Sequence, residues 1–433
     1  MNQAGIGHSR IAMSTAGTQA DLDFLVNLFQ EDWWLEQLAA KNLSAVYARK
    51  WYPDNYEICV FECYLDMYTL TGKSRYLDAV LGGWALYKDP IQGWMFPGGS
   101  VSLNENFLYP PGSLPLEFKG SWGVHSRPTG ELCPSAFWIK LNHRLHRLYP
   151  DSEVYIGEIE QTLINVALAG QGPGGVGVRY FARLHGEKDP TTSVGTCCEG
   201  QSARIWGGVP ELIFSQSVES PSNSNGKNAA HIRVNLFEPS TLSLLAEGGR
   251  GAINITIATG WPWDTRVDIL VEAQAPCTSD DLRLSIRVPG WVNTQSVPFY
   301  VSGAPIVYGL PGTYTTIPYN FSWGLGVSNI SFSLPMAVKP WAYTGVSQVP
   351  GFSRAAFSFG PILLAAMGEW NNTLDGIVLS GVEGGPSLPA QWLVPSSGAL
   401  PSSSTFSVKG VVNATFVPYY SIQNEKFTVY PLF

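Results

Sequence analysis

Two short segments of this 433-residue sequence bring thiols and carboxylates together in a pattern that suits metal binding. One is ELCP at residues 131–134, and the other is TCCE at residues 196–199. Three thiols and one carboxylate complete a tetrahedral zinc shell, provided that the fold brings the two segments together. Zinc keeps its thiol ligands deprotonated, and one thiolate can then act as a nucleophile. The residues of these two segments could therefore bind zinc and supply a nucleophilic thiolate.

The local sequence predicts that these cysteines lie at helix starts. Pro134 suits the first position of a helix, where its missing N–H costs nothing. Cys133 is then expected at an amino terminus, where the helix dipole favours a thiolate. Cys197 and Cys198 likewise precede a stretch of helical character that contains Ile205. From residue types alone two other interpretations stay open: buried free cysteines, since Cys is among the most buried residue types, and a vicinal disulfide between Cys197 and Cys198.

Two glutamates are candidates for an acid/base partner of such a thiolate. Glycoside hydrolysis usually employs two carboxyl groups, one as acid/base and one as nucleophile. If a zinc-bound thiolate replaces the nucleophilic carboxylate, a single glutamate suffices. Glu105, in the loop GGSVSLNENF, is one candidate and Glu117 is the other. By composition alone, a lone loop glutamate is more often a solvated surface residue.

Helices are predicted from residue 20 to about residue 217. Apolar residues recur at helical spacing within residues 22–29, 60–68, 76–84, 137–148 and 156–167. Gly72 is expected to end the second of these helices. The connections are short, so neighbouring helices are expected to run antiparallel, as in a toroid of helical hairpins.

The second half of the chain has the pattern of β-strands. Turn formers at residues 221–226 mark the change. Beyond them, INITIAT, RVDILVE, LRLSIRV and ISFSLPM alternate apolar and polar residues between turns. The prediction is a multidomain α plus β protein: a helical (α/α) toroid at residues 1–220, incomplete as it stands, followed by a β-sandwich region of one or two jelly-roll-like domains at residues 221–433.

The amino-acid composition limits which kinds of partner the protein can bind and in which cellular compartment it is expected. A hydrophobic fraction of 45% with only 14% charged residues fits a packed globular protein. The net charge of −8 argues against nucleic acid or an anionic membrane as a partner. Six cysteines are too few for a disulfide scaffold at this length. The first residues lack a signal-peptide pattern, so a cytoplasmic location is the default expectation, and secretion the alternative if further chain precedes Met1.

Taken together, these segments resemble glycoside hydrolase family 127, the β-L-arabinofuranosidase clan once known as DUF1680. TCCEGQSARIWGGVPELIFS resembles its double-cysteine motif, GELCPSAFW its Glu-x-Cys motif, and GGSVSLNENF its glycine-rich acid/base loop. Downstream, VNLFEPS, GWPWDTRVDI, IRVPGW, SLPM, FGPILLA and VPYY are similar to landmarks of the family's β domains, in the same order. The resemblance extends over about residues 50–433.

The resemblance implies a retaining glycosidase that removes terminal β-L-arabinofuranosyl or related furanosyl groups from an oligosaccharide or glycoconjugate. Cys197 would be the nucleophile, forming a thioglycosyl intermediate. Glu105, in preference to Glu117, would be the acid/base. The implied zinc ligands are Glu131, Cys133, Cys197 and Cys198.

Two departures from the family pattern support an alternative function. Residues 58–62 resemble a family helix with a sugar-binding histidine, yet Cys59 occupies that place. The chain also begins within the toroid, so we expect the ring-closing helices to be missing and residues 1–433 alone to be poorly soluble and weakly active. The alternative is a catalytically inactive carbohydrate-binding or structural paralogue that retains zinc. Four histidines, His125, His143, His146 and His185, could contact a sugar, but a lone histidine is more often a surface or core residue, so none of them is assigned a role.

Overall fold

The protein was studied as a computed structural model that describes residues 20, 32–42, 45, 55–88, 129–191, 195–219, 229–245, 252–262, 264–274, 282–301, 303–318, 326–343, 349–396 and 405–433. The chain divides into two compact units. One comprises residues 1–96 and 101–128, and the other residues 97–100 and 129–433. The predicted helix at residues 22–29 and the turn formers at 221–226 lie outside the described residues.

The first unit contains three described helices: α3 (Asp32–Ala39), α5 (Asn55–Thr71) and α6 (Ser74–Tyr87). Helices α5 and α6 confirm the periodicity of residues 60–68 and 76–84. Gly72 separates them with φ of +68°, in the left-handed region that glycine adopts at little cost. Helices α3 and α6 pack closely at Gly82, where a Cβ atom would clash with the carbonyl oxygen of Leu38.

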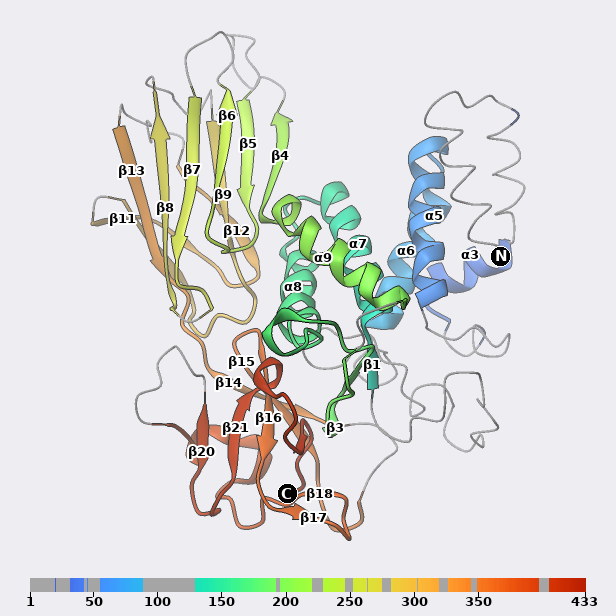
Figure 1. The fold of residues 1–433 in the computed structure, drawn as a ribbon. Helices are drawn as coiled ribbons and strands as arrows, with labels where there is room; N and C mark the ends of the chain where they lie inside the picture. Colours follow the sequence, from blue (N-terminus) through green and yellow to red (C-terminus); the bar gives the residue numbers. More distant parts are fainter. Residues whose placement is uncertain are drawn as a thin grey trace. The chain divides into compact units, whose positions relative to one another are not determined.

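Three helices of the second unit pack together: α7 (Leu132–Leu148), α8 (Glu153–Thr162), which continues as the π-turn η1 (Leu163–Ala167), and α9 (Cys197–Ile213). Helix α7 contacts both α8 and α9 (Figure 1). Helices α7 and α8 confirm two predicted helices. Helix α7 begins two residues before Pro134, which still lies in the first turn, where its N–H would have no helical partner. Among the described residues, no helix is long and apolar enough to cross a membrane.

Short strands interrupt the region from residue 20 to about residue 217, for which only helices and connecting loops were predicted. They are β1 (Thr129–Glu131), β2 (Phe181–Arg183), β3 (His185–Gly186) and β4 (Phe214–Glu219). Strand β1 pairs antiparallel with β2, whereas β3 and β4 pair with strands from the second half of the chain. The prediction was wrong at these places because two to six residues are too few to display a period of their own.

Two facing sheets follow the helices and form a β-sandwich. Their strands run in the orders β11-β10-β13-β8-β7-β6 and β12-β9-β5-β4. The four alternating runs predicted from the sequence are found as β7, β8, β9 and β13. The core between the sheets includes Ile232, Ile255 and Ile269, all fully buried. The strands are β5 (Ala229–Val234), β6 (Ser240–Leu245), β7 (Ala252–Thr259), β8 (Arg266–Ala273), β9 (Leu282–Val288), β10 (Val297–Val301), β11 (Ala304–Gly309), β12 (Thr313–Thr316) and β13 (Gly326–Ser333).

A further antiparallel sheet is built from the carboxyl-terminal strands around an aromatic core. Phe357 packs edge-on against Trp392 and Phe416 at its centre. The predicted class, α helices followed by β-sandwich sheets, is confirmed. The strands are β14 (Val338–Ala342), β15 (Ala355–Phe359), β16 (Ile362–Met367), β19 (Leu393–Pro395), β20 (Phe406–Val408), β21 (Thr415–Pro418) and β22 (Phe427–Thr428), with β17 (Trp370–Asn371) and β18 (Gly376–Ile377) forming a separate pair.

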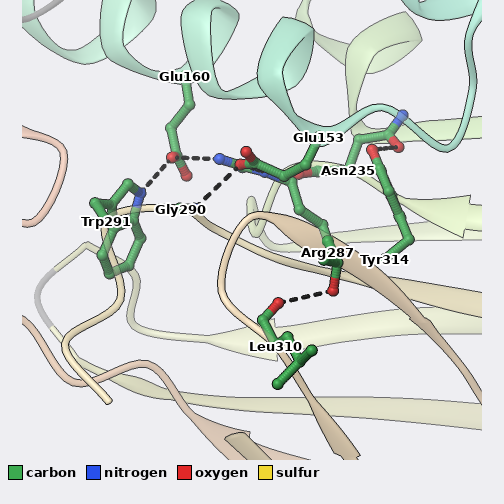
Figure 2. A network of polar contacts seen from close by, with 9 residues as sticks. Glu153, Glu160, Asn235, Arg287, Gly290, Trp291, Leu310 and Tyr314 are labelled. Carbon is green, nitrogen blue, oxygen red and sulfur yellow. Dashed lines mark hydrogen bonds and ion pairs between the residues drawn. The ribbon is translucent and has the colours of Figure 1, made fainter. Parts of the chain in front are cut away.

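A buried charge cluster fastens helix α8 to the four-stranded sheet (Figure 2). The guanidinium of Arg287, on β9, is completely buried and donates to Glu153 Oε1 and Glu160 Oε2, each at 2.8 Å. It also donates to the carbonyl of Asn235 at 3.1 Å, and Trp291 Nε1 donates to Glu160 Oε2 at 2.7 Å. Burial alone would lower the pKa of Arg287, but the two carboxylates outweigh it and raise that pKa. The arginine therefore stays charged.

His146, on α7, lies in the same contact region between helices and sandwich. Its side chain is fully buried, its ring stacks on Tyr314 with centroids 5.9 Å apart, and Nε2 lies 3.4 Å from Ser215 Oγ. Burial is the main reason that its pKa falls from 6.5 to about 4. The imidazole is therefore neutral in the folded protein at neutral pH, which makes it a packing residue of this interface.

We expect this histidine to make the fold acid-sensitive. Between pH 6.5 and about 4 the unfolded chain binds a proton at His146 and the folded protein does not, so stability falls as the pH falls through this window. The full shift corresponds to about 3 kcal/mol. In the variant His146→Phe, which keeps an aromatic ring on Tyr314, the loss of unfolding free energy from pH 6.5 to 4 should be smaller than in the wild type by about that amount. Equal losses in urea titrations of the two proteins would refute the assignment.

Candidate metal and catalytic site

Three cysteines from two helix starts converge in the second unit. The Sγ atoms of Cys133, Cys197 and Cys198 all lie within 4.8 Å of one another, and those of Cys133 and Cys198 are 3.2 Å apart. Cys133 is the second residue of α7, and Cys197 and Cys198 are the first two of α9. All three are free thiols, so no vicinal disulfide is formed. Cys133 and Cys198 are buried and Cys197 is exposed, which leaves one thiol of the cluster accessible to a substrate.

The β1–β2 pair brings these two helix starts together. Glu131, the last residue of β1, lies opposite Phe181 of β2. Leu132 N then donates to the carbonyl of Tyr180 at 3.2 Å, so the turn into α7 is held by the same strand. That carbonyl also lies 3.9 Å from the Cys198 Sγ, and the Tyr180 hydroxyl lies 3.7 Å from the Cys197 Sγ. Tyr180 thus contacts both helix starts at once.

The sequence analysis did not single out Tyr180. In the run VRYFAR it looks like an ordinary strand residue, and no spacing to a cysteine identifies it. Its position depends on pairing between segments some fifty residues apart in the chain. A short strand next to the cysteine motif would have been the only local signal.

The start of α9 is held by its own sequence. Thr196 precedes the helix, and its backbone N–H donates to Glu199 Oε2 at 3.2 Å, which is one half of a capping box. The other carboxylate oxygen, Glu199 Oε1, is buried and has no hydrogen-bond partner among the described residues. Glu199 therefore acts in the structure as a helix-start residue, which explains the acidic residue directly after the two cysteines.

The electrostatics of the cluster favour a neutral Cys133 thiol when no cation is present. The hydrogen bond to Cys198 is the largest influence on Cys133, and together with burial it raises the pKa of that thiol well above its ordinary value. Three thiolates this close would repel one another in a poorly solvated place. A bound divalent cation reverses this preference, because it stabilises the deprotonated ligands.

The donor set fits a thiophilic metal ion. With Zn–S bonds of about 2.3 Å, sulfur ligands around a tetrahedral zinc stand roughly 3.8 Å apart. The observed upper separation of 4.8 Å and the shortest contact of 3.2 Å bracket that value. Thiols are soft ligands that favour zinc over magnesium or calcium. The three cysteines are therefore placed to hold such an ion with small adjustments of their side chains.

The remaining predicted site residues are described only in part or not at all. The backbone of Glu131 adjoins Cys133 in the chain, at the end of β1, but its side chain lies outside the described residues. Glu105, Glu117 and His125 also lie outside them, as does the side chain of Cys59. The fourth ligand and the acid/base thus stay predictions.

Of the four histidines considered in the sequence analysis, His143, His146 and His185 are described, and each has a place in the packing. His146 packs between α7 and the sandwich, as described above. His143, on α7, has its pKa lowered, chiefly by burial. His185 is buried in β3, where Nδ1 lies 3.0 Å from Thr428 Oγ1 and its ring lies 4.7 Å from that of Trp370. None of these contacts involves the cysteine cluster.

Comparison with known proteins gives a consistent assignment. The family described as the catalytic domain of GH127 β-L-arabinofuranosidase matches residues 95–211, which include the three cysteines. The middle domain of the same enzymes matches residues 231–336, which form most of the sandwich. Together the two matches span just over half of the chain. The helices, the cysteine site and the sandwich therefore define a chain of the glycoside hydrolase class, and within that class it belongs to glycoside hydrolase family 127.

Individual relatives are more distant and longer. A non-reducing end β-L-arabinofuranosidase of Bifidobacterium longum subsp. longum is 24% identical over 255 residues, which cover 56% of this chain and 34% of that protein. The chain therefore spans about a third of the length of this curated relative.

Solved structures show the same fold. A GH127 β-L-arabinofuranosidase from Geobacillus stearothermophilus T6 superposes with a TM-score of 0.57 at 17% identity, covering 86% of this chain and 59% of that one. A GH127 β-arabinofuranosidase superposes with a TM-score of 0.63 at 18% identity, covering 98% of this chain and 67% of that one.

Proposed function

We propose that this chain is the site-bearing part of a retaining exo-glycosidase that removes terminal β-L-arabinofuranosyl or closely related furanosyl groups. The observation that carries the proposal is the convergence of Cys133, Cys197 and Cys198 at two helix starts, in a chain of a glycoside hydrolase family. An inactive paralogue would need no accessible thiol in this cluster, yet Cys197 is exposed.

The proposed metal site consists of the three thiols and Glu131. Bound zinc would keep the thiols deprotonated and so supply a nucleophilic thiolate at neutral pH. The residues of the chain supply the rest. Helix starts of α7 and α9 place partial positive charge beside the sulfurs, and Tyr180 contacts the accessible one. Cys197 is the proposed nucleophile because it alone of the three is exposed.

The proposed reaction proceeds in two displacements. The Cys197 thiolate attacks the anomeric carbon, and a C–S bond forms as the bond to the leaving oxygen breaks. The acid, proposed as Glu105, gives its proton to that oxygen. Water then attacks the same carbon from the other side, the C–S bond breaks, and the carboxylate of Glu105 takes the proton from water. Two inversions retain the anomeric configuration.

The direct test of this function is hydrolysis of an aryl β-L-arabinofuranoside by the full-length protein. Turnover on the order of 10 per second is ordinary for an enzyme. We expect turnover of that order with retained configuration of the first-formed product. A protein that binds zinc and the sugar but shows no turnover would instead be the inactive paralogue.

Metal content is expected to be about one zinc per chain in protein never exposed to a chelator. Cys198→Ser should reduce it below about a tenth, because it replaces a buried sulfur donor by a poor zinc ligand. Cys63→Ser is the matched control: Cys63, on α5, forms no disulfide and does not belong to the cluster, so its loss should leave the zinc content unchanged. Plasma emission measurements on the three proteins decide the matter. A wild type with less than a tenth of an equivalent would refute the metal site.

The acid/base is expected to be revealed by the dependence on the leaving group. Glu105→Gln should slow substrates with poor leaving groups by about a hundredfold or more, while activated aryl glycosides, which need little protonation, should be far less affected. Glu117→Gln is the paired comparison. If Glu117→Gln shows this discrimination and Glu105→Gln does not, the assignment must be exchanged.

A further inference from the structure

The residues that precede α9 are fixed to the cysteine site at one end. We call residues 179–189 the site loop. Within it, Tyr180 accepts the hydrogen bond from Leu132 N at 3.2 Å and lies against Cys197 and Cys198. Any displacement of this loop therefore moves a direct neighbour of two cluster thiols.

The site loop is fixed at many other points by the last residues of the chain. Arg179, whose neighbour in the chain is Tyr180, is only 4% exposed. Its guanidinium donates to both the carbonyl oxygen and the side-chain Oε1 of Gln423, at 3.3 and 3.1 Å. It also donates to the carbonyls of Gln171 and Asp189, at 2.7 and 3.1 Å. One buried cation thus joins three stretches of backbone.

The contacts continue along the loop. The Tyr419 hydroxyl donates to the carbonyl of Arg183 at 2.8 Å. Val429 N donates to the carbonyl of Leu184 at 2.8 Å, within the pairing of β3 with β22. Backbone and side-chain bonds from residues 419–429 therefore follow the loop over most of its length.

A second buried basic side chain lies at the far end of the loop. Lys188 is 8% exposed, and its ammonium donates to the carbonyl of Tyr419 at 2.9 Å and stands over the ring of the same residue, 4.5 Å from its centroid. It also donates to the carbonyl of Ala169 at 3.4 Å. Burial of a long side chain costs much conformational entropy, and the contacts of Lys188 with Tyr419 and Ala169 must offset that cost.

We propose that residues 419–429 form a carboxyl-terminal strap that positions the cysteine site through the site loop, with Arg179 as the principal positioning residue. Its guanidinium donates to four acceptors, which uses most of its five N–H donors, and no other side chain carries that many. The catalytic consequence rests on the proposed function, whereas the positional claim concerns only the cysteines and the strap.

The test uses the accessibility of a buried thiol. Cys198 is completely buried, so its alkylation by iodoacetamide in the metal-free full-length protein requires local opening. Arg179→Met should increase that rate about tenfold, because it removes the donor shared by the carbonyls of Gln171, Asp189 and Gln423. The weaker variant Gln423→Ala, which removes one acceptor from the strap side, should increase it in the same direction. Arg266→Met is the matched control, since this exposed arginine pairs only with groups of the sandwich.

The outcomes separate local from global effects. The positioning role of the strap is supported if Cys198 is alkylated faster in Arg179→Met and Gln423→Ala, with a rate that hardly depends on low urea concentrations. The alkylation rate of Arg266→Met should stay within about twofold of the wild type. Rates within about twofold of wild type for both Arg179→Met and Gln423→Ala would overturn it, and so would an increase with the full urea dependence of global unfolding. Zinc affinity, measured by competition with a chromophoric chelator, should weaken in parallel by about tenfold. If the wild type binds no zinc, the proposed function fails, but the alkylation rates still decide the positional claim.

Discussion

Replacing Cys197 by serine is expected to abolish hydrolysis of aryl β-L-arabinofuranosides while leaving the protein folded. A serine hydroxyl at neutral pH is a far weaker nucleophile than a thiolate, and removal of an enzymatic nucleophile typically costs a factor of roughly 10⁴ or more in kcat. Cys197 is exposed, so the loss of its sulfur creates no buried cavity. The measurement is kcat for the variant and the wild type, together with their melting temperatures.

Two comparisons keep this result specific. Cys63→Ser replaces a described cysteine that forms no disulfide and does not belong to the cluster, and it should retain full activity. Zinc content of Cys197→Ser is measured alongside, because Cys197 is also a proposed zinc ligand. Turnover lost with zinc retained identifies the nucleophile, whereas turnover lost together with zinc reports only on the metal site. An active Cys197→Ser protein would show that the chemistry lies elsewhere.

Replacing Arg287 by methionine is expected to produce the largest loss of stability in the second unit. The substitution leaves Glu153 and Glu160 buried at 8% and 3% exposure without their cation. Breaking a buried pair from one side costs about 3–5 kcal/mol, since an uncompensated charge remains. For a domain of this size that corresponds to a melting temperature lower by roughly 10 °C. Thermal unfolding followed by circular dichroism measures it.

A matched surface pair provides the control. Arg266 makes a bidentate contact with Asp268 on the outer face of β8, and solvent screens such a pair, so Arg266→Met should melt close to the wild type. The triple variant with Arg287→Met, Glu153→Gln and Glu160→Gln should recover part of the loss, because the unpaired charges are gone. If Arg287→Met itself melts within a degree or so of the wild type, the cluster does not fasten α8 to the sandwich.

Helices and strands were predictable where their pattern is local and long. The periodic runs at residues 137–148 and 156–167 became α7 and α8, and RVDILVE became β8. Alternation of apolar and polar residues predicted the structure of LRLSIRV only in part. Its alternation predicts a strand with one polar, exposed face, and β9 does form, but α8 covers that face and buries Arg287. Which face a helix covers depends on tertiary contacts that no alternation encodes.

The sequence predicted which residue types form the cysteine site, but not which residues hold them in place. Thiols at two helix starts were read directly from ELCP and TCCE, and the structure brings all three together. The contacts of Tyr180 with these thiols, and the strap that holds Arg179, join residues up to 244 positions apart. Such pairings follow from the docking of whole sheets, which a single sequence does not reveal. The glutamates proposed at this site stay predictions.

A covalent label would test the role of the cysteine cluster most directly. A β-L-arabinofuranose-configured haloacetamide directs an electrophile to the thiol that faces the anomeric carbon of the sugar, and peptide mass spectrometry locates the adduct. We expect one adduct per chain, on Cys197, formed in competition with L-arabinose and accompanied by loss of all activity. An adduct on Cys198 would reverse the assignment within the pair. Full activity in a protein whose three cysteines are all modified would contradict the thiolate mechanism as a whole.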